Sequence, residues 1–132
     1  MAARKGFYWH VLPALLYVVI IFWLGSIHTS LTIPQDLLPR DKFTHLVAFG
    51  LLTCLALRAL RFELGSAPLN RLVAASVALS SLIGALLELW QSMLSYRSAE
   101  FGDWIADTIG AILAGLASLL WFWWRGRRVA TG

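Results

Sequence analysis

Residues 72–93 read LVAASVALSSLIGALLELWQSM, and their only charged side chain is that of Glu88. About 20 consecutive apolar residues in a helix cross the hydrocarbon core of a bilayer, so this stretch predicts a membrane span. Ser76, Ser80 and Gly84 precede Glu88 at intervals of four, which places all four residues on one helical face. Small residues on such a stripe are typical of a close approach by a neighbouring helix. We therefore expect Glu88 to point into a bundle and not toward lipid.

The whole chain has the composition of a membrane protein. Of its 132 residues, 59% are hydrophobic and only 14% are charged, which is more apolar surface than a soluble domain of this size can bury. Apolar stretches of suitable length cover residues 7–25, 43–60, 72–90 and 104–124. The first is longer than the apolar core of a signal peptide, and no small-x-small cleavage site follows it. We predict an all-α integral membrane bundle of four transmembrane helices, forming a single domain over residues 5–128.

Basic residues are distributed unequally between the two ends of the predicted spans. Eight of the 11 flank the N-terminus, the turn between the second and third spans, and the C-terminus: Arg4, Lys5, Arg58, Arg61, Arg71, Arg125, Arg127 and Arg128. Since basic loops stay inside the cell, we expect a multi-pass protein of the cytoplasmic membrane with both termini in the cytoplasm. The net charge of +4 comes from residues that flank apolar segments. This pattern indicates membrane lipids, and not nucleic acid, as partners.

Ionisable side chains gather at the opposite, outer ends of the second and fourth spans. Asp41 and His45 are one helical turn apart, and so are Asp103 and Asp107. An aspartate at the start of a helix can cap its free amides. His45 and Asp107, however, lie a turn inside the membrane, where ionisable groups are costly and usually functional. The fourth span also carries a small-xxx-small set for helix packing, formed by Ala106, Gly110 and Ala114.

The third span contributes Glu88 and Gln91 at the same depth. Glu88 lies near the C-terminal end of its helix, where the helix dipole disfavours an anion, so capping does not explain it. Arg97 follows in a short loop, within reach of Glu88 or Asp107. An ion pair there would offset part of the cost of burying a carboxylate. We expect the polar residues of all three spans to converge.

The spacing of these residues resembles the pattern of the VanZ-like family of small membrane proteins. That pattern has an Asp-Lys-x-x-His start to one span, a Glu-x-x-Gln, an arginine, and an aspartate followed by asparagine and glycine on the last span. The counterparts here are Asp41, Lys42, His45, Glu88, Gln91, Arg97, Asp103 and Gly110. The resemblance covers about residues 20–116, and Asp107 departs from it by standing where the family commonly has asparagine. It implies kinship with a protein associated with low-level resistance to the glycopeptide teicoplanin, whose target lies outside the membrane.

Several functions are compatible with this outer polar site. In the first, the site binds or modifies a cell-envelope lipid, a lipid-linked wall precursor or a lipophilic glycopeptide antibiotic, through Asp41, Lys42, His45, Glu88, Gln91, Arg97, Asp103 and Asp107. In the second, the chain is an intramembrane enzyme: His45 and Glu88 form an acid and base pair, or Asp103 and Asp107 bind a divalent cation such as Mg²⁺. In the third, the polar network only holds the bundle together. Transport ranks last, because the charges concentrate at one depth.

Overall fold

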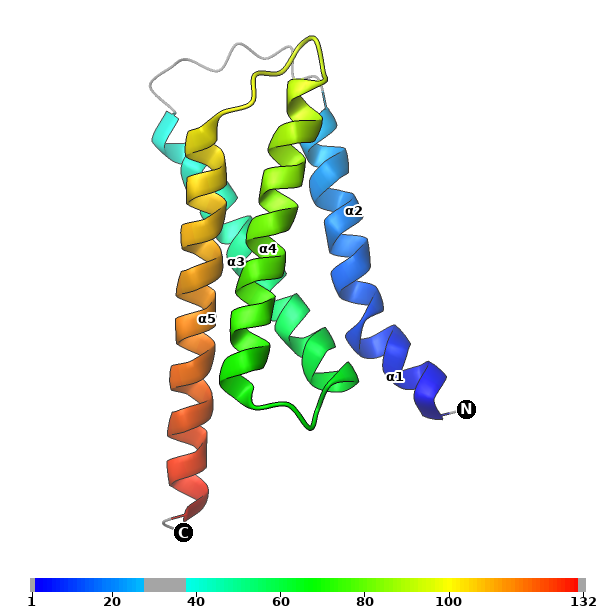
Figure 1. Ribbon diagram of the computed structural model, residues 1–132, viewed down its shortest axis with the longest axis vertical. Helices are drawn as coiled ribbons and strands as arrows, with labels where there is room; N and C mark the ends of the chain where they lie inside the picture. The colour runs from blue at the N-terminus through cyan, green and yellow to red at the C-terminus, as the bar shows by residue number, and fades with distance from the viewer. Residues whose placement is uncertain (1, 28–37, 131–132) are drawn as a thin grey trace.

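The computed structural model describes residues 2–27 and 38–130, and the side chains of residues 6–27 and 42–128. Within these ranges the chain contains helices and no strand (Figure 1). The helices are α1 (Ala2–His10), α2 (Leu12–Ser26), α3 (Leu38–Glu63), α4 (Leu69–Ser92) and α5 (Phe101–Ala130). Three segments are long and apolar enough to cross a membrane: Lys42–Glu63, Leu69–Ser92 and Phe101–Arg128. The prediction of an all-α membrane protein is thereby confirmed.

The first predicted span is not one helix. α1 ends at His10 and α2 begins at Leu12, so the expected continuous helix over residues 7–25 is broken near Val11. Pro13 explains the break, because it has no N–H to donate to the carbonyl of Trp9 and its ring crowds that carbonyl. The 15 residues of α2 give a helix about 22 Å long, which is shorter than the roughly 30 Å hydrocarbon core of a bilayer.

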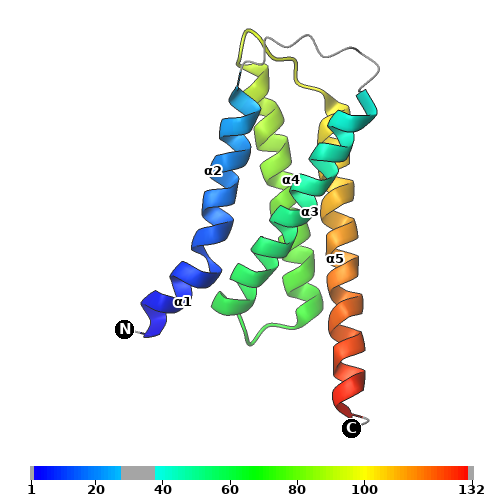
Figure 2. The same cartoon turned by 180° about the vertical axis from the view of Figure 1, so that it is seen from behind.

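The helices run up and down between two ends of an elongated molecule. Both termini and the turn between α3 and α4 lie at one end, which we call the terminal end (Figures 1 and 2). The loop between α4 and α5, residues 93–100, lies at the other, which we call the polar end. α4 and α5 run beside each other while α3 crosses them obliquely, and α2 leans against α3 and α4.

α3 and α5 cross closely because Gly110 has no side chain. A Cβ on Gly110 would collide with the backbone of Leu46, and a Cβ on Gly50 would come 3.4 Å from the carbonyl oxygen of Gly110. The predicted small residues therefore do allow two backbones to approach. This close crossing fixes the position of the first turns of α5 relative to α3, where the polar residues lie.

The predicted stripe on α4 is buried, as expected. Ser76 and Ser80 are completely inaccessible, and Glu88 retains only 8% of its exposure. The Thr53 hydroxyl of α3 contacts the Ser80 hydroxyl at 2.9 Å. Large apolar side chains such as Leu82, Leu86 and Leu89 are exposed on the other faces of α4, as expected for a helix whose outer surface meets lipid.

Candidate functional site

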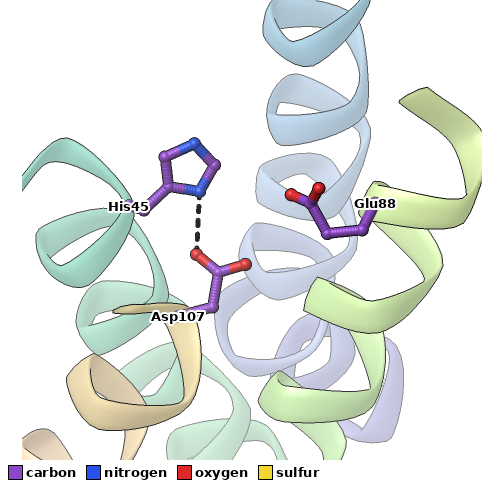
Figure 3. A group of neighbouring side chains, drawn as sticks. All are labelled: His45, Glu88 and Asp107. Carbon is purple, nitrogen blue, oxygen red and sulfur yellow. Dashed lines mark hydrogen bonds and ion pairs between the residues drawn. The ribbon is translucent and has the colours of Figure 1, made fainter. Parts of the chain in front are cut away.

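Three ionisable side chains from three helices point toward one another near the polar end. They are His45 of α3, Glu88 of α4 and Asp107 of α5 (Figure 3). Each offers a ligand atom that lies within 4.8 Å of those of the other two. His45 Nδ1 and Asp107 Oδ1 form a hydrogen bond of 2.9 Å. The expected convergence of the three spans therefore occurs at these residues.

The space for Asp107 is created by the stripe on α4. A Cβ on Gly84 would lie 2.7 Å from Asp107 Oδ2 and 3.1 Å from Asp107 Cβ. The lack of a side chain at Gly84 thus leaves room for the carboxylate between α4 and α5. Asp107 is completely buried as a result.

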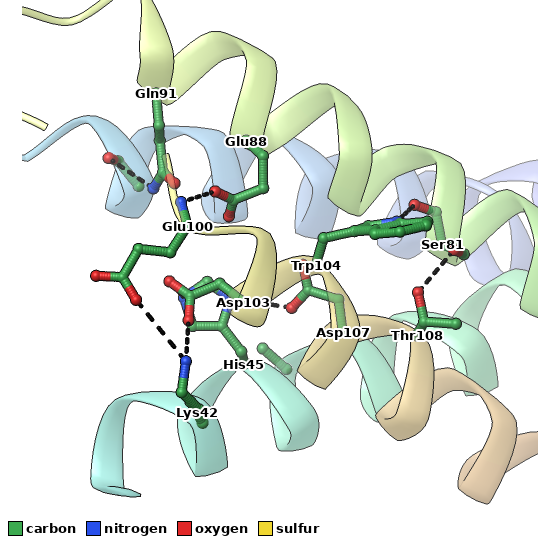
Figure 4. Close-up of polar contacts among 12 residues, drawn as sticks. Lys42, His45, Ser81, Glu88, Gln91, Glu100, Asp103, Trp104, Asp107 and Thr108 are labelled. Atoms are coloured by element: carbon green, nitrogen blue, oxygen red, sulfur yellow. Dashed lines mark hydrogen bonds and ion pairs between the residues drawn. The ribbon is translucent and has the colours of Figure 1, made fainter. Parts of the chain in front are cut away.

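The carboxylates of Glu88 and Asp107 each form a hydrogen bond through only one of their two oxygens. Glu88 Oε2 accepts a hydrogen bond of 2.9 Å from the backbone N–H of Glu100 (Figure 4). Glu88 Oε1 and Asp107 Oδ2 are buried and have no hydrogen-bond partner among the residues that the structure describes. Buried polar atoms are nearly always paired, so two orphaned oxygens in one cluster need an explanation.

The expected ion pair between Arg97 and Glu88 or Asp107 is not formed. Arg97 Nε donates instead to the carbonyl oxygen of Gly25 at 3.1 Å, and Gln91 Nε2 donates to the same oxygen at 3.3 Å. The carbonyls of the last turn of a helix lack partners within the helix, and cations are favoured beside them. Arg97 and Gln91 therefore stabilise the C-terminal end of α2.

Two aromatic residues bind the same helix end, a role that the sequence did not predict. Tyr96 donates from its hydroxyl to the Ser26 carbonyl oxygen at 2.8 Å, and Trp90 Nε1 donates to Ser26 Oγ at 2.8 Å. In the sequence, the signal for this contact was a polar group on an aromatic ring at or just beyond the outer end of the third predicted span. The outer end of α4 and the following loop thus hold α2 in place.

We call His45, Glu88 and Asp107 the inner cluster. A second set of charges lies beside it. Lys42 Nζ lies 3.4 Å from Asp103 Oδ1 and 3.7 Å from Glu100 Oε2, and His45 Nε2 lies 3.8 Å from Asp103 Oδ2. Figure 4 shows Lys42 directed at these two carboxylates and not at Glu88 or Asp107. Glu100 was missed in the sequence because it lies in a loop with no helical spacing to the other residues.

The predicted Asp103 and Asp107 pair is divided between these two sets. Both residues are buried, but Asp103 contacts Lys42 and His45, whereas Asp107 joins His45 and Glu88. Asp41 lies in the first turn of α3, and its side chain is outside the described residues. α5 is further tied to α4 by Trp104 Nε1, which donates to the Ser81 carbonyl oxygen, and by a 2.8 Å contact between the Ser81 and Thr108 hydroxyls.

A cavity of about 370 Å³ lies next to the cluster. Its apolar lining comes from Ile21, Leu24, Ala48, Phe49 and Leu87, and its polar lining includes His45, Gln91, Arg97, Glu100 and Asp103. Cavities of this size accommodate small ligands or parts of larger ones. A cavity of about 420 Å³, lined by residues such as His10, Cys54 and Arg58, contains none of the residues predicted for the site.

A comparison with known families places the chain in one of them. The family model described as VanZ/LLP1 matches residues 11–123, from the start of α2 through most of α5. The chain belongs to the VanZ/LLP1 family. No curated protein and no solved structure matches it. The predicted VanZ-like family is therefore confirmed, and the polar cluster lies within the matched region of this VanZ/LLP1 protein.

Proposed function

We propose that this VanZ/LLP1 protein binds the head group of a cell-envelope amphiphile at its polar end. The candidate ligands are an envelope lipid, a lipid-linked wall precursor and a lipophilic glycopeptide. The observation that carries the proposal is the cavity, which combines an apolar wall with a polar wall. An amphiphile requires both, since its chain avoids water while its head group needs hydrogen bonds and charge.

Arg97 is the residue of the polar wall best suited to an anionic head group. It is exposed, it lines the cavity, and its hydrogen bond to Gly25 uses Nε. A guanidinium can bind a phosphate or carboxylate through two parallel hydrogen bonds. Lys42 is a weaker candidate because it already contacts Asp103 and Glu100.

The proposed topology places the polar end outside the cell and both termini in the cytoplasm. It is supported by the arginines of the terminal end, where Arg61 lies over the ring of Phe122, and Arg127 and Arg128 lie over Trp123 and Trp124. Paired arginine and tryptophan side chains suit the interface between the membrane and an anionic cytoplasmic surface. The cavity would then meet ligands of the outer leaflet and cell wall.

Binding of defined ligands to purified protein tests this proposal. Native mass spectrometry would compare phosphatidylglycerol, a polyprenyl phosphate and teicoplanin, with Arg97→Gln as the test variant and Arg71→Gln, at the terminal end, as its control. We expect at least one ligand to bind, with affinity reduced about tenfold or more by Arg97→Gln, as for loss of a charge-assisted hydrogen bond. Equal affinity in both variants, or no binding of any of the three, would overturn the proposal.

The hydrogen bond between His45 and Asp107 favours a second candidate, catalysis on the bound head group. A carboxylate that holds an imidazole by one nitrogen orients the other for proton transfer, and His45 lines the cavity. Mass spectrometry of the lipid after incubation would reveal a changed head group. His45→Asn should abolish that change while His10→Asn, at the terminal end, should not; an unchanged lipid with wild-type protein would exclude this candidate for the ligands tested.

A further inference from the structure

We infer that His45, Glu88 and Asp107 form a binding site for a divalent transition-metal cation, of which Zn²⁺ and Mn²⁺ are the best candidates. This differs from the pair Asp103 and Asp107 that the sequence suggested. It also goes beyond ligand binding in the cavity, since a cation would bind to the inner cluster whether or not an amphiphile is present.

The distances suit a shared cation. The ligand atoms of the three residues lie within 4.8 Å of one another, and His45 Nδ1 is 2.9 Å from Asp107 Oδ1. Two ligands bound at about 2.1 Å to one metal, at angles between about 90° and 109°, lie about 3.0–3.4 Å apart. Small movements of side chains would therefore replace the hydrogen bond by two metal bonds.

Two orphaned oxygens provide the second, independent argument. Within the described part of the chain, Glu88 Oε1 and Asp107 Oδ2 are buried without a hydrogen-bond partner, and the two residues are 8% and 0% exposed. Leaving a buried acceptor unpaired is costly, and still more so if the group is charged. A cation between the two carboxylates would provide the missing partner for these lone pairs.

The arrangement of charges also favours a cation in this position. Lys42, the nearest lysine, is turned toward Asp103 and Glu100, and Arg97 donates to the end of α2. Among the described ion pairs and contacts, the His45 imidazole is the basic group beside Glu88 and Asp107. A divalent cation would balance two carboxylates while the imidazole stays neutral.

The donor set distinguishes between cations. Ca²⁺ and Mg²⁺ prefer oxygen ligands alone, whereas one imidazole and two carboxylates suit Zn²⁺, Mn²⁺ and related metals. Three protein ligands leave at least one coordination position for water or a ligand oxygen, as in catalytic zinc sites. Because His45 also lines the cavity, an oxygen of a bound head group is a suitable fourth ligand.

Metal titration of the full chain in detergent, after treatment with EDTA, tests the inference. Calorimetry with Zn²⁺ and Mn²⁺ would measure stoichiometry and affinity, and the absorption bands of Co²⁺ would report on its ligands. We expect one ion per chain and a loss of affinity of about tenfold or more in Glu88→Gln and Asp107→Asn. The Co²⁺ bands should shift in His45→Gln, which removes the nitrogen ligand.

The control is Glu63→Gln, which changes an exposed carboxylate at the C-terminal end of α3, at the terminal end of the molecule. It should leave the affinity within about threefold of wild type. Glu88→Gln keeps an oxygen to accept the Glu100 amide, so this variant remains informative if Asp107→Asn does not fold. The inference is overturned if no ion binds at one per chain, if Glu88→Gln binds as tightly as wild type, or if Glu63→Gln weakens binding as much as Glu88→Gln does. Arg97→Gln retains all three donors, so its loss of amphiphile binding with metal binding intact would separate this site from the lipid proposal.

Discussion

Gly84 on α4 and Asp107 on α5 fit together so closely that a Cβ on the glycine would lie 2.7 Å from Asp107 Oδ2. We predict that Gly84→Ala displaces the carboxylate and lowers the free energy of unfolding by about 1–3 kcal/mol, as overpacking typically does. Gly126→Ala is the control, because nothing lies within 4 Å of a Cβ there. Thermal unfolding in detergent would measure both, and a Gly84→Ala variant as stable as Gly126→Ala would contradict this packing.

A second glycine pair tests the crossing of α3 and α5. Gly110→Ala places a methyl group into the Leu46 backbone, which cannot move without shifting α3, whereas the Cβ of Gly50→Ala would be 3.4 Å from its nearest neighbour. We expect Gly110→Ala to unfold at a much lower temperature, or to fail to assemble, and Gly50→Ala to change the unfolding free energy by less than about 1 kcal/mol. Equal stability of the two variants would mean that the helices cross elsewhere.

Much of this architecture follows from helical spacing in the sequence. The four-residue interval from Ser76 to Glu88 predicted a buried face, because side chains four apart share one side of a helix. The break before α2 was not predicted, although Pro13 was visible, because the apolar run continues through it. Hydrophobicity indicates which residues avoid water but does not show where the helical hydrogen bonds are interrupted.

The contacts of the α4–α5 loop tie α2 to the bundle, and they give a third prediction. Tyr96→Phe removes the hydroxyl that donates to the Ser26 carbonyl oxygen, so the last turn of α2 should exchange its amide hydrogens roughly fivefold faster, as for loss of about 1 kcal/mol. Tyr8→Phe, in α1 at the terminal end, is the control. Hydrogen exchange measured by mass spectrometry on peptides of α2 would reveal the difference; identical exchange in both variants would show that this hydrogen bond does not hold α2.

Surface labelling tests the proposed topology with a matched pair of serines. Ser95 and Ser66 are both exposed, in the α4–α5 loop and the α3–α4 turn. In a Cys54→Ser background, an impermeant thiol reagent added to intact cells should label Ser95→Cys and not Ser66→Cys. The reverse pattern would place the polar end in the cytoplasm and rule out access from the cell wall.

Only some residues and contacts of the site could be predicted from the sequence. His45, Glu88 and Asp107 were identified because ionisable residues inside a span need a reason to be there. The partner of Glu88 was not, since the backbone amide of Glu100 carries no signature in the sequence. Arg97 was assigned to a carboxylate on charge alone, whereas the structure directs it to the end of α2, because loop geometry decides which acceptor an arginine reaches.

The central claim is that the buried carboxylates are kept for a ligand and not for packing, and the thermal stability of Glu88→Gln tests it most directly. In EDTA, we expect this variant to unfold at the same temperature as wild type or a higher one, because it removes a buried acid yet keeps an acceptor for Glu100. Added Zn²⁺ or Mn²⁺ should then raise the unfolding temperature of wild type alone. A lower unfolding temperature for Glu88→Gln in EDTA, with the same response to metal as wild type, would show that the cluster only holds the helices together.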